Sequence, residues 1–422
     1  MSALKIDSMF FHIPLFERLF SVICANAFSM SPFSLSKIAH IFFKPGFLRR
    51  RWNKSVKQRY PNIVAQSVFE ADNPKAITVN NKPIVKPRET VSSPKQSMWR
   101  KMVLILNIHF GYYYYYYSSM TNFMVDEGIK FKPDIIHAND LDTLWAGWQI
   151  KKKTGAKLIY DAHEIWTEQG LSFPKLINYL FKVIEKYLFR KIDHFITINE
   201  SIAKVLDATY HFQKNLKQTI IYNCPRYQKC EFRHHNPEKI VALYQGRYGP
   251  NRGLEQIATA AKYLNPGIEI HFRGSEDEKI LGKLKKIAKN INRKNVIFHP
   301  PVEMKDLVNY AKTADIGLIA YLPVHIDNEL CMPNKVFEYM MAGLALAVSD
   351  LPELRRLVKE YNHGTTFNPY DPKDIAKKIN QLAKNNLFRL RQNSLKAAKI
   401  CNWENEEIKL KKIYKSLIDE PS

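Results

Sequence analysis

Two arginines in a short loop are the side chains of this sequence best suited to binding a phosphate. Arg247 and Arg252 lie five residues apart in GRYGPNRG at 246–253, between an apolar run and a predicted helix. A guanidinium group binds phosphate oxygens through paired, charge-assisted hydrogen bonds, so the two could clamp a diphosphate. The segment has neither the GxGxxG pattern of a dinucleotide site nor that of a P-loop. A solvent-exposed basic loop is the alternative.

A second candidate for anion binding is the helix predicted within DNELCMPNKVFEYMMAGLALAVSD at 327–350. This helix is expected to begin at Asn334 and to end at Gly343, so that Lys335 and Glu338 share one face of its first turn. The apolar run after Gly343 predicts a strand buried on both faces. In open α/β sheets, anionic ligands bind where such strands end and helices begin. The alternative for Lys335 and Glu338 is an ion pair in solvent.

Polar residues also gather at the ends of two earlier predicted strands. They are Asp161, His163 and Glu164 at the end of 157–164, and His137, Asn139, Asp140 and Asp142 at the end of 134–140. Strand ends that meet at one edge of a sheet make these residues candidates for acid–base or binding roles. The alternatives are a structural His163 and a helix-capping Asp140. Neither group has the spacing of a metal site.

The elements that must position these residues alternate between strands and helices. Before residue 226 we expect strands over 103–110, 134–140, 157–164, 194–199 and 219–225, and helices over 141–155, 174–191 and from Ser201. A second series starts at Ile240 and ends with helices over 372–385 and 405–418. Such alternation predicts an α/β fold of two Rossmann-like, doubly wound domains facing a central cleft. The expected parts are an atypical basic N-terminal region over 1–100, domains over 101–225 and 226–402, and a helix over 403–422 that returns to the first domain.

The composition indicates a globular protein with an acidic partner. Its 422 residues are 45% hydrophobic, and 64 Lys and Arg against 40 Asp and Glu give a net charge of +24. This charge favours nucleotide phosphates, anionic lipid or nucleic acid as partners, and residues 1–100 hold 16 basic and 5 acidic residues of the total. Five scattered cysteines indicate a reducing compartment. Since the sequence has no membrane-spanning run and no nucleic-acid-binding motif, we expect a cytoplasmic protein that touches the inner face of the plasma membrane.

Two basic segments, at 42–59 and 174–191, are candidates for that membrane contact. Aromatic side chains bury at a lipid interface while arginines meet lipid phosphates. An ordinary helical layer of the first domain is the alternative for residues 1–60. The run from Tyr112 to Tyr117 is low in complexity and receives no chemical role.

From about residue 130 onward the sequence resembles the retaining glycosyltransferases of family 4, which have the GT-B double Rossmann fold. The resemblance is carried by HANDLDTLWAG from 137, YDAHEIW from 160, the strand–GRYGPNRG–helix unit, FRGS from 272, and PNKVFEYMMAG from 333 followed by AVSDLPE. These motifs stand in the family's order. In that family the second domain binds a nucleotide-sugar donor and the first domain binds the acceptor.

The resemblance implies a role for each matching residue. His163 would lie near the reacting sugar, Arg247 and Arg252 would bind the donor diphosphate, and Glu338 would bind the ribose hydroxyls. The backbone after Phe298, with Val302, would meet the base. The expected site is then catalytic His163, Arg247 and Arg252; donor-binding Glu338, Lys335, Asn334, Gly246, Gly274 and Val302; and acceptor-side His137, Asp140, Asp161 and Glu164. Neither a metal nor a cofactor is expected besides the nucleoside diphosphate sugar.

The implied reaction is transfer of a sugar, with retention, from a nucleoside diphosphate sugar to an acceptor hydroxyl. The acceptor would be a glycan or a lipid-linked glycan in surface polysaccharide or glycolipid synthesis. Two departures from the family pattern leave alternatives open. The first glutamate of the E-x7-E motif would stand at 330, where this chain has Leu330 beside Glu329, and residues 1–100 lack the family's opening strand, glycine-rich loop and helix. A non-catalytic relative that binds a partner and a sugar-nucleotide epimerase are the alternative functions.

Overall fold

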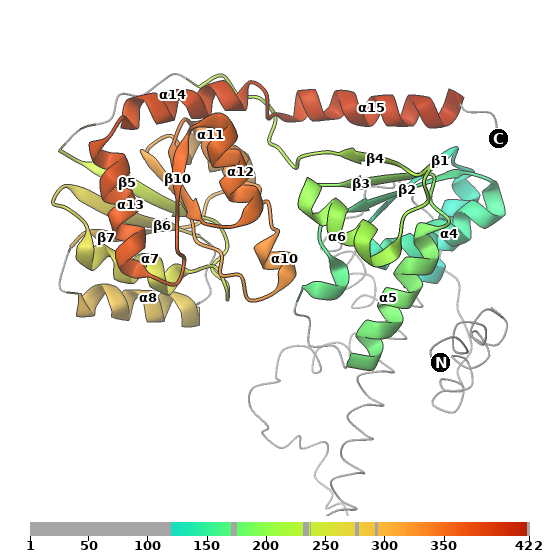
Figure 1. The fold of residues 1–422 in the computed structure, drawn as a ribbon, viewed down its shortest axis with the longest axis horizontal. Coiled ribbons are helices and arrows are strands. Elements are labelled where there is room, and N and C mark those ends of the chain that lie inside the picture. Colours follow the sequence, from blue (N-terminus) through green and yellow to red (C-terminus); the bar gives the residue numbers. More distant parts are fainter. Residues whose placement is uncertain are drawn as a thin grey trace, which may run out of the picture. The chain divides into compact units, whose positions relative to one another are not determined.

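The structure, a computed structural model, describes residues 120–169, 175–230, 236, 238–274, 278–291 and 294–419, without the side chains of 175–177. The chain divides into two units, Met1–Lys132 and Pro133–Ser422. In the first unit the described residues form a helix over 120–131. The second unit contains two parallel sheets with their helices (Figure 1). The strand expected over 103–110, the tyrosine run and the basic segment 42–59 lie outside the described residues.

The first sheet has four parallel strands in the order β1-β2-β3-β4. Its elements are β1 (Ile135–Asn139), α4 (Asp140–Thr154), β2 (Lys157–Ala162), η1 (Trp166–Glu168), α5 (Lys175–Phe189), β3 (His194–Thr197), α6 (Glu200–Tyr210) and β4 (Lys217–Ile220). All four residues of β3 are buried, as expected of an inner parallel strand covered on both faces. Gly155 ends α4 in the left-handed conformation with φ 78°, which a glycine adopts without steric cost.

The second sheet has six parallel strands in the order β10-β9-β8-β5-β6-β7. The strands are β5 (Ile240–Gln245), β6 (Ile268–Arg273), β7 (Val296–His299), β8 (Ile316–Ile319), β9 (Ala345–Ser349) and β10 (Gly364–Phe367). With β5 taken as its first strand, this is the Rossmann strand order, and the order reverses between β5 and β8. The two parallel sheets confirm the predicted fold class.

Helices cover both faces of the second sheet. They are α7 (Leu254–Ala260), η2 (Ala261–Tyr263), α8 (Glu278–Asn290), η3 (Met304–Asp306), α9 (Leu307–Ala311), α10 (Ile326–Glu329), α11 (Lys335–Ala342), α12 (Pro352–Tyr361), α13 (Pro372–Lys384) and α14 (Leu387–Ala398). One apolar cluster includes Ile257, Leu284 and Ile379 from α7, α8 and α13. A second cluster includes Val336 and Leu354 from α11 and α12. Each such large apolar side chain contributes about 1.5–3 kcal/mol when it is fully buried.

Tyr339 sets the rotation of α11 about its own axis. Its ring lies so close to Gly317 of β8 that an added Cβ there would collide with it. Its hydroxyl accepts a hydrogen bond from the Gln245 N–H of β5, at 2.8 Å. Residues four apart share a helix face, so Lys335 must point toward the same part of the sheet. Lys335 is accordingly only 7% exposed, and the alternative of an ion pair in solvent with Glu338 is wrong.

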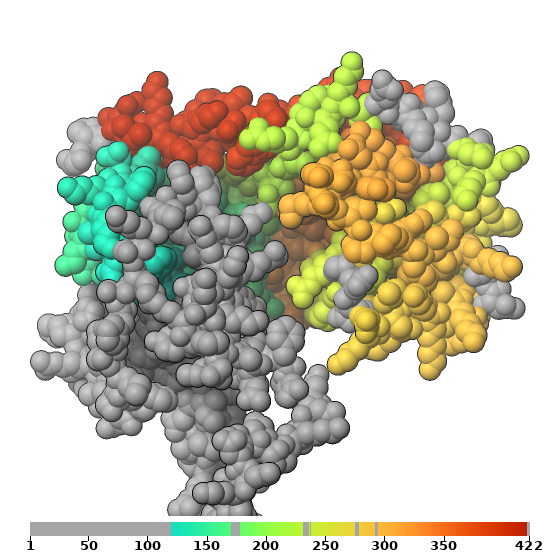
Figure 2. Space-filling view, turned by 180° about the vertical axis from the view of Figure 1, so that it is seen from behind, coloured from blue at the N-terminus to red at the C-terminus, as the bar shows by residue number. Residues whose placement is uncertain are grey.

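The last helix, α15 (Trp403–Asp419), packs on the first sheet although it follows the helices of the second. Ile413 and Leu417 join Ile159 and Ile196 in one apolar cluster. The helix is adjacent to β1 and lies along this sheet in Figure 1. Its atoms are among the red ones in Figure 2.

The strand expected over 219–225 was placed too far along the chain, because β4 ends at Ile220. The Ile221 N–H still donates to the Thr197 carbonyl of β3 at 3.0 Å, and beyond it the backbone bonds to α15. The Tyr222 N–H donates to Glu406 Oε2 at 3.1 Å, and the Pro225 carbonyl accepts from the Trp403 N–H at 3.0 Å.

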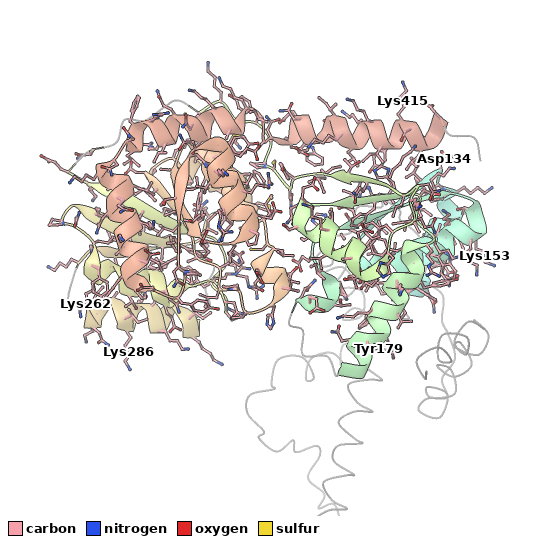
Figure 3. The ribbon with its side chains drawn as sticks, viewed as in Figure 1. Asp134, Lys153, Tyr179, Lys262, Lys286 and Lys415 are labelled. Carbon is pink, nitrogen blue, oxygen red and sulfur yellow. The ribbon has the colours of Figure 1, made fainter. Side chains whose placement is uncertain are left out.

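The positive charge of the described residues lies largely on exposed helices. Lys153, Lys262, Lys286 and Lys415 are exposed and project from the ribbon in Figure 3. Within the described part of the chain, no helix combines the length and the apolar character needed to cross a bilayer.

A buried ion pair joins α14 to the sheet. Arg391 Nη1 lies 3.0 Å from Asp315 Oδ1, and both residues are 1% exposed. Each member of this pair also binds backbone. Arg391 Nε donates to the Gly343 carbonyl at 2.9 Å, and Asp315 Oδ2 accepts from the Val241 N–H at 2.9 Å. One pair therefore fixes the end of α11 and the start of β5 together.

Replacing Arg391 by Met should lower the free energy of unfolding by about 3–5 kcal/mol, because Asp315 would stay buried without its cation. Urea unfolding of the variant and the parent measures this loss. The matched control is Arg355→Met, since the Arg355 side chain is 55% exposed and pairs with Asp350. The control substitution should lower the free energy of unfolding by less than about 1 kcal/mol. Equal losses in the two variants would contradict the role of the buried pair.

Candidate functional site

The loops after β5 and β8 meet where the strand order of the second sheet reverses. This position is where open α/β sheets bind their ligands. The loop over 246–253 follows β5, and Tyr321 follows β8. A backbone hydrogen bond from Leu322 N–H to the Asn251 carbonyl, 2.9 Å long, joins the two loops.

Lys335 places a buried ammonium group at this junction. Its Nζ lies 4.2 Å from the centroid of the Tyr244 ring and 5.7 Å from that of Tyr321. The Nζ atom has no hydrogen-bond partner although it is buried. Burial, and then the charge of Arg252, lower the pKa of Lys335 to about 7. A cation in such surroundings lacks an anion, and this site could accept one.

Arg252 converges on the same tyrosine as Lys335. Its guanidinium lies over the Tyr321 ring, with Cζ 4.9 Å from the centroid, and Nη1 donates a hydrogen bond to the Tyr321 hydroxyl. Arg247 is exposed, and its carbonyl accepts a hydrogen bond from the Tyr244 hydroxyl at 2.9 Å. The loop thus holds one arginine next to the buried lysine and leaves the other at the surface.

Two predicted donor-binding glycines lie against each other at this junction. A Cβ at Gly274, which follows β6, would collide with the Gly246 carbonyl oxygen and the Tyr248 ring. Gly246 has φ +137°, and a Cβ there would stand 3.1 Å from Lys335 Nζ. A side chain at Gly246 would therefore separate Lys335 from whatever approaches the loop.

The other predicted donor-side residues surround the start of α11 or follow β7. Glu338 is partly buried; burial raises its pKa, and the charge of Lys335 opposes that rise. Asn334 is exposed, and its carbonyl accepts from the Glu338 N–H at 3.1 Å. Val302 is partly exposed beyond the end of β7. The roles of these three residues stay predictions.

The predicted acceptor-side residues form a hydrogen-bonded group at the carboxyl ends of β1 and β2. Asp161 Oδ2 lies 2.9 Å from His137 Nε2 and 3.5 Å from His163 Nε2, so one carboxylate oxygen faces both rings. Burial by itself would raise the pKa of Asp161, but hydrogen bonds from His137 and His163 hold it well below its usual range. Burial would likewise lower the pKa of His163, yet the hydrogen bond and charge of Asp161 raise it to about 9. His163 is therefore a cation at neutral pH.

Asp140 does not cap α4 through its side chain, so that alternative is wrong. The N-cap residue is Asn139, whose side chain makes no capping hydrogen bond, whereas Asp140 Oδ1 accepts from the His163 N–H at 3.0 Å. Asp140 has φ +60°, a conformation that costs energy in a residue with a Cβ. Asp140 thereby anchors the turn that carries His163. Glu164, in the same turn, is exposed and contributes its charge next to His163.

Two hydrogen bonds join the two sheet-bearing parts of the second unit next to His163. Asp327 Oδ1 accepts from the Ile165 N–H at 3.0 Å, and the Leu330 carbonyl accepts from Asn199 Nδ2 at 2.9 Å. Leu330 is itself 8% exposed, so the position expected to hold a glutamate is packed as an apolar residue. The segment that precedes α11 thus binds the strand ends of the first sheet.

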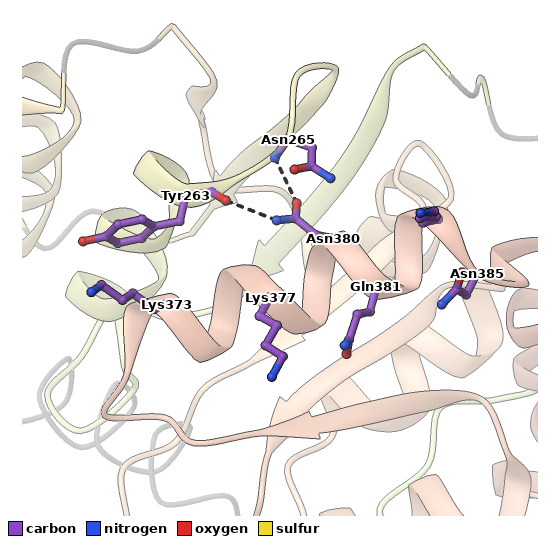
Figure 4. A pocket seen from close by; sticks show the side chains of 8 residues that line it. Tyr263, Asn265, Lys373, Lys377, Asn380, Gln381 and Asn385 are labelled. Atoms are coloured by element: carbon purple, nitrogen blue, oxygen red, sulfur yellow. Dashed lines mark hydrogen bonds between the residues drawn. The ribbon is translucent and has the colours of Figure 1, made fainter.

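A separate surface pocket lies on α13 and contains no predicted site residue (Figure 4). It is lined by Tyr263, Asn265, Lys373, Lys377, Asn380, Gln381, Lys384 and Asn385. Within it, Asn380 bonds the backbone of Tyr263 and Asn265. In the residues that the structure describes, no group of three or more His, Cys, Asp or Glu side chains could hold a metal ion.

Two family models match the sequence and together span both sheets of the second unit. The model described as "Glycosyl transferases group 1" matches residues 228–400, and the model described as "Glycosyltransferase Family 4" matches residues 96–224. The chain is a group 1 glycosyltransferase. No curated protein matches the sequence.

Solved structures share the GT-B fold of this glycosyltransferase. Sucrose-phosphate synthase from Thermosynechococcus elongatus superposes with a TM-score of 0.56 at 17% identity, over 68% of this chain and 74% of that one. HepE from Anabaena in complex with UDP superposes with a TM-score of 0.58 at 14% identity, over 72% of this chain and 82% of that one. A glycosyltransferase from Rickettsia africae superposes with a TM-score of 0.55 at 14% identity, over 71% of this chain and 81% of that one.

Four side chains of the glycosyltransferase site were not predicted from the sequence. Tyr244 and Tyr321 flank Lys335, Asp327 binds the turn after β2, and Tyr414 of α15 lies 2.9 Å from His137 Nδ1. Tyr321 could have been found, because it directly follows a buried strand at the point where the strand order reverses. Tyr414 gave no such signal, since it lies 277 residues from His137 in a helix of ordinary composition.

Replacing Lys335 by Met should raise the free energy of unfolding at neutral pH by about 1–3 kcal/mol, because it removes a buried polar group that has no partner. The pKa of Lys335 falls from 10.5 to about 7 on folding, so the folded protein binds fewer protons between these values and its stability rises with pH there. Urea unfolding across this pH range should show that the variant lacks the rise.

The exposed lysine Lys305, whose side chain is 75% accessible, provides the control for this measurement. Its replacement by Met should change neither the free energy of unfolding at neutral pH nor its rise with pH. A Lys335→Met variant with the parent's pH dependence would mean that the buried ammonium does not determine it.

Proposed function

We propose that this glycosyltransferase moves a sugar from a nucleoside diphosphate sugar to an acceptor hydroxyl with retention of anomeric configuration. The observation that carries the proposal is the pairing of Arg252 with the buried, unpartnered Lys335 beside the start of α11. Two basic side chains and the positive end of the α11 dipole match the charge of a diphosphate. HepE from Anabaena, which shares the fold, binds UDP and UDP-glucose, and this supports a similar donor here.

On the donor side, Arg247 and Arg252 would bind the diphosphate together with Lys335. Gly246 and Gly274 would let the diphosphate approach the backbone, since neither residue has a side chain to block it. Glu338 would accept hydrogen bonds from the ribose hydroxyls. Asn334 and the backbone near Val302 would contact the donor on its other sides. These assignments follow the resemblance to the family 4 glycosyltransferases, and the contacts of Arg252 and Lys335 with Tyr321 support the part that concerns the diphosphate.

Cleavage of the glycosidic bond develops negative charge on the leaving diphosphate. Fixed cations bind this charge more strongly in the transition state than in the ground state, so they lower the barrier. The leaving phosphate oxygen can take the acceptor's proton on the face from which it departs. The new bond then forms on that same face, which gives retention without a covalent enzyme intermediate.

On the acceptor side, His163 would lie next to the reacting sugar as a cation held by Asp161. The neighbouring His137, Asp140 and Glu164 would complete a polar surface for the acceptor. Because the pKa of His163 is about 9, a role that needs its proton would be fulfilled at neutral pH and lost as the pH rises through that value. The acceptor would be a glycan or a lipid-linked glycan of surface polysaccharide or glycolipid synthesis.

Such an acceptor would place the enzyme at the inner face of the plasma membrane. The net charge of +24 and the basic helix α5, which exposes Tyr179 and Val183, support contact with anionic lipid.

Replacing Arg252 by Ala should lower kcat/KM for transfer about 30- to 1000-fold, which corresponds to a loss of about 2–4 kcal/mol of transition-state binding. The measurement is a screen of radiolabelled nucleotide-sugars with parent and variant, followed by proton NMR of the product's anomeric centre. The control is Arg389→Ala, since Arg389 is exposed on α14, and this variant should keep the parent's rate.

Three results would count against the proposal. Full turnover by the Arg252 variant would rule out the role of Arg252 in binding the diphosphate. A product with inverted anomeric configuration would rule out a retaining mechanism. Conversion of the donor alone into an epimer would indicate the epimerase instead.

A further inference from the structure

A continuous line of side chains runs from the last helix to His163. The Tyr414 hydroxyl of α15 lies 2.9 Å from His137 Nδ1, and His137 Nε2 lies 2.9 Å from Asp161 Oδ2. The same carboxylate oxygen lies 3.5 Å from His163 Nε2. The two middle members are largely shielded, because the side chains of His137 and Asp161 are 13% and 15% exposed. The line therefore links α15, β1 and the end of β2.

The charge of Asp161 constrains the direction of these hydrogen bonds. Asp161 is ionised, so it accepts from both histidines. In the tautomer of His137 that carries its hydrogen on Nε2, toward Asp161, Nδ1 accepts the hydroxyl proton of Tyr414. Burial, and then the charge of Asp161, raise the pKa of Tyr414 to about 12, so the hydroxyl keeps this proton at neutral pH. The ring of His137 also meets that of Tyr414 edge-on, with 6.0 Å between centroids.

We infer that Tyr414 and His137 are positioning residues, which hold the Asp161 carboxylate against His163 and so control the orientation and charge of that imidazole from the C-terminal helix. The inference rests on the proposed function for the part that His163 takes in transfer. The hydrogen-bonded line itself does not depend on that function.

Other charged groups also face His163, and their effects on its titration must be distinguished from that of Asp161. Asp140 faces it from the start of α4, and Glu164 faces it from the same turn. Asp327 of α10 and Arg252 act on Glu164 from the second sheet's side. Asp161 favours the charged imidazole more strongly than Asp140 or Glu164 does. Its position should therefore have the largest influence on the titration of His163.

The first test is a histidine NMR titration of the full chain, with the His163 signal identified by its absence in His163→Gln. The parent's His163 should titrate near pH 9. In Tyr414→Phe, His137 loses the donor that fixes its ring, Asp161 is held less firmly, and His163 should titrate lower by about half to one pH unit. Asp161→Asn should lower it further, toward the ordinary value of about 6.5.

Two variants of the same helix serve as controls. Ser416→Ala removes a hydroxyl that bonds only within α15, to the Ile413 carbonyl at 2.9 Å. Leu417→Ala removes buried packing against the first sheet and should lower stability. Neither should move the His163 titration. An unchanged His163 in Tyr414→Phe, or an equal change in Leu417→Ala, would overturn the inference.

The second test is kinetic and uses the same variants. Tyr414→Phe should lower kcat about threefold to tenfold, as expected for one lost hydrogen bond, without changing the KM for the donor. The alkaline limb of the kcat profile should move to lower pH together with the His163 titration. A lower kcat with an unmoved limb would indicate a structural effect only and would contradict the inference. If no nucleotide-sugar is turned over, the proposed function fails, whereas the NMR titration still decides the role of Tyr414.

Discussion

The junction between β5 and β8 depends on how the Tyr339 side chain fixes the orientation of α11. Tyr339 packs its ring on Gly317 and accepts a hydrogen bond from the Gln245 N–H, so α11 cannot rotate without breaking a buried contact and a backbone bond. Lys335 lies one turn earlier on the same face of α11, so the packing of Tyr339 places the Lys335 side chain next to Gly246 in the loop over 246–253. The cation is buried against Tyr244 and Tyr321, and this costs stability unless an anion approaches. Local packing thus prepares a site for negative charge.

On the first sheet, the residues of two strand ends share a single carboxylate. Asp161 faces His137 and His163 with the same oxygen, while Asp140 binds the backbone of the turn that presents His163. Such an arrangement fixes both the charge and the direction of an imidazole. The two halves of the site therefore use different means: an unpaired cation on one side and a paired cation on the other.

The sequence predicted the elements well and the orientation of side chains less well. Periodicity and apolar runs located β2, β5 and α11, because buried parallel strands and amphipathic helices leave strong local patterns. The burial of Lys335 was missed, since a lysine at a helix start is exposed in most proteins. The contacts that override this join Tyr339 of the same helix to Gly317 and Gln245 on two strands that are distant in the sequence. The end of β4 was missed for a similar reason, because the chain leaves the sheet to bond with α15, almost 200 residues later. Tertiary contacts of this kind have no local signature.

The return of α15 to the first sheet makes this helix part of the apolar core of that sheet. Ile413, Tyr414 and Leu417 all lie within the last ten positions of the sequence. A premature stop codon or proteolytic trimming there would strip the apolar cover from the first sheet and remove the hydroxyl that bonds His137. A purification tag is therefore better attached elsewhere.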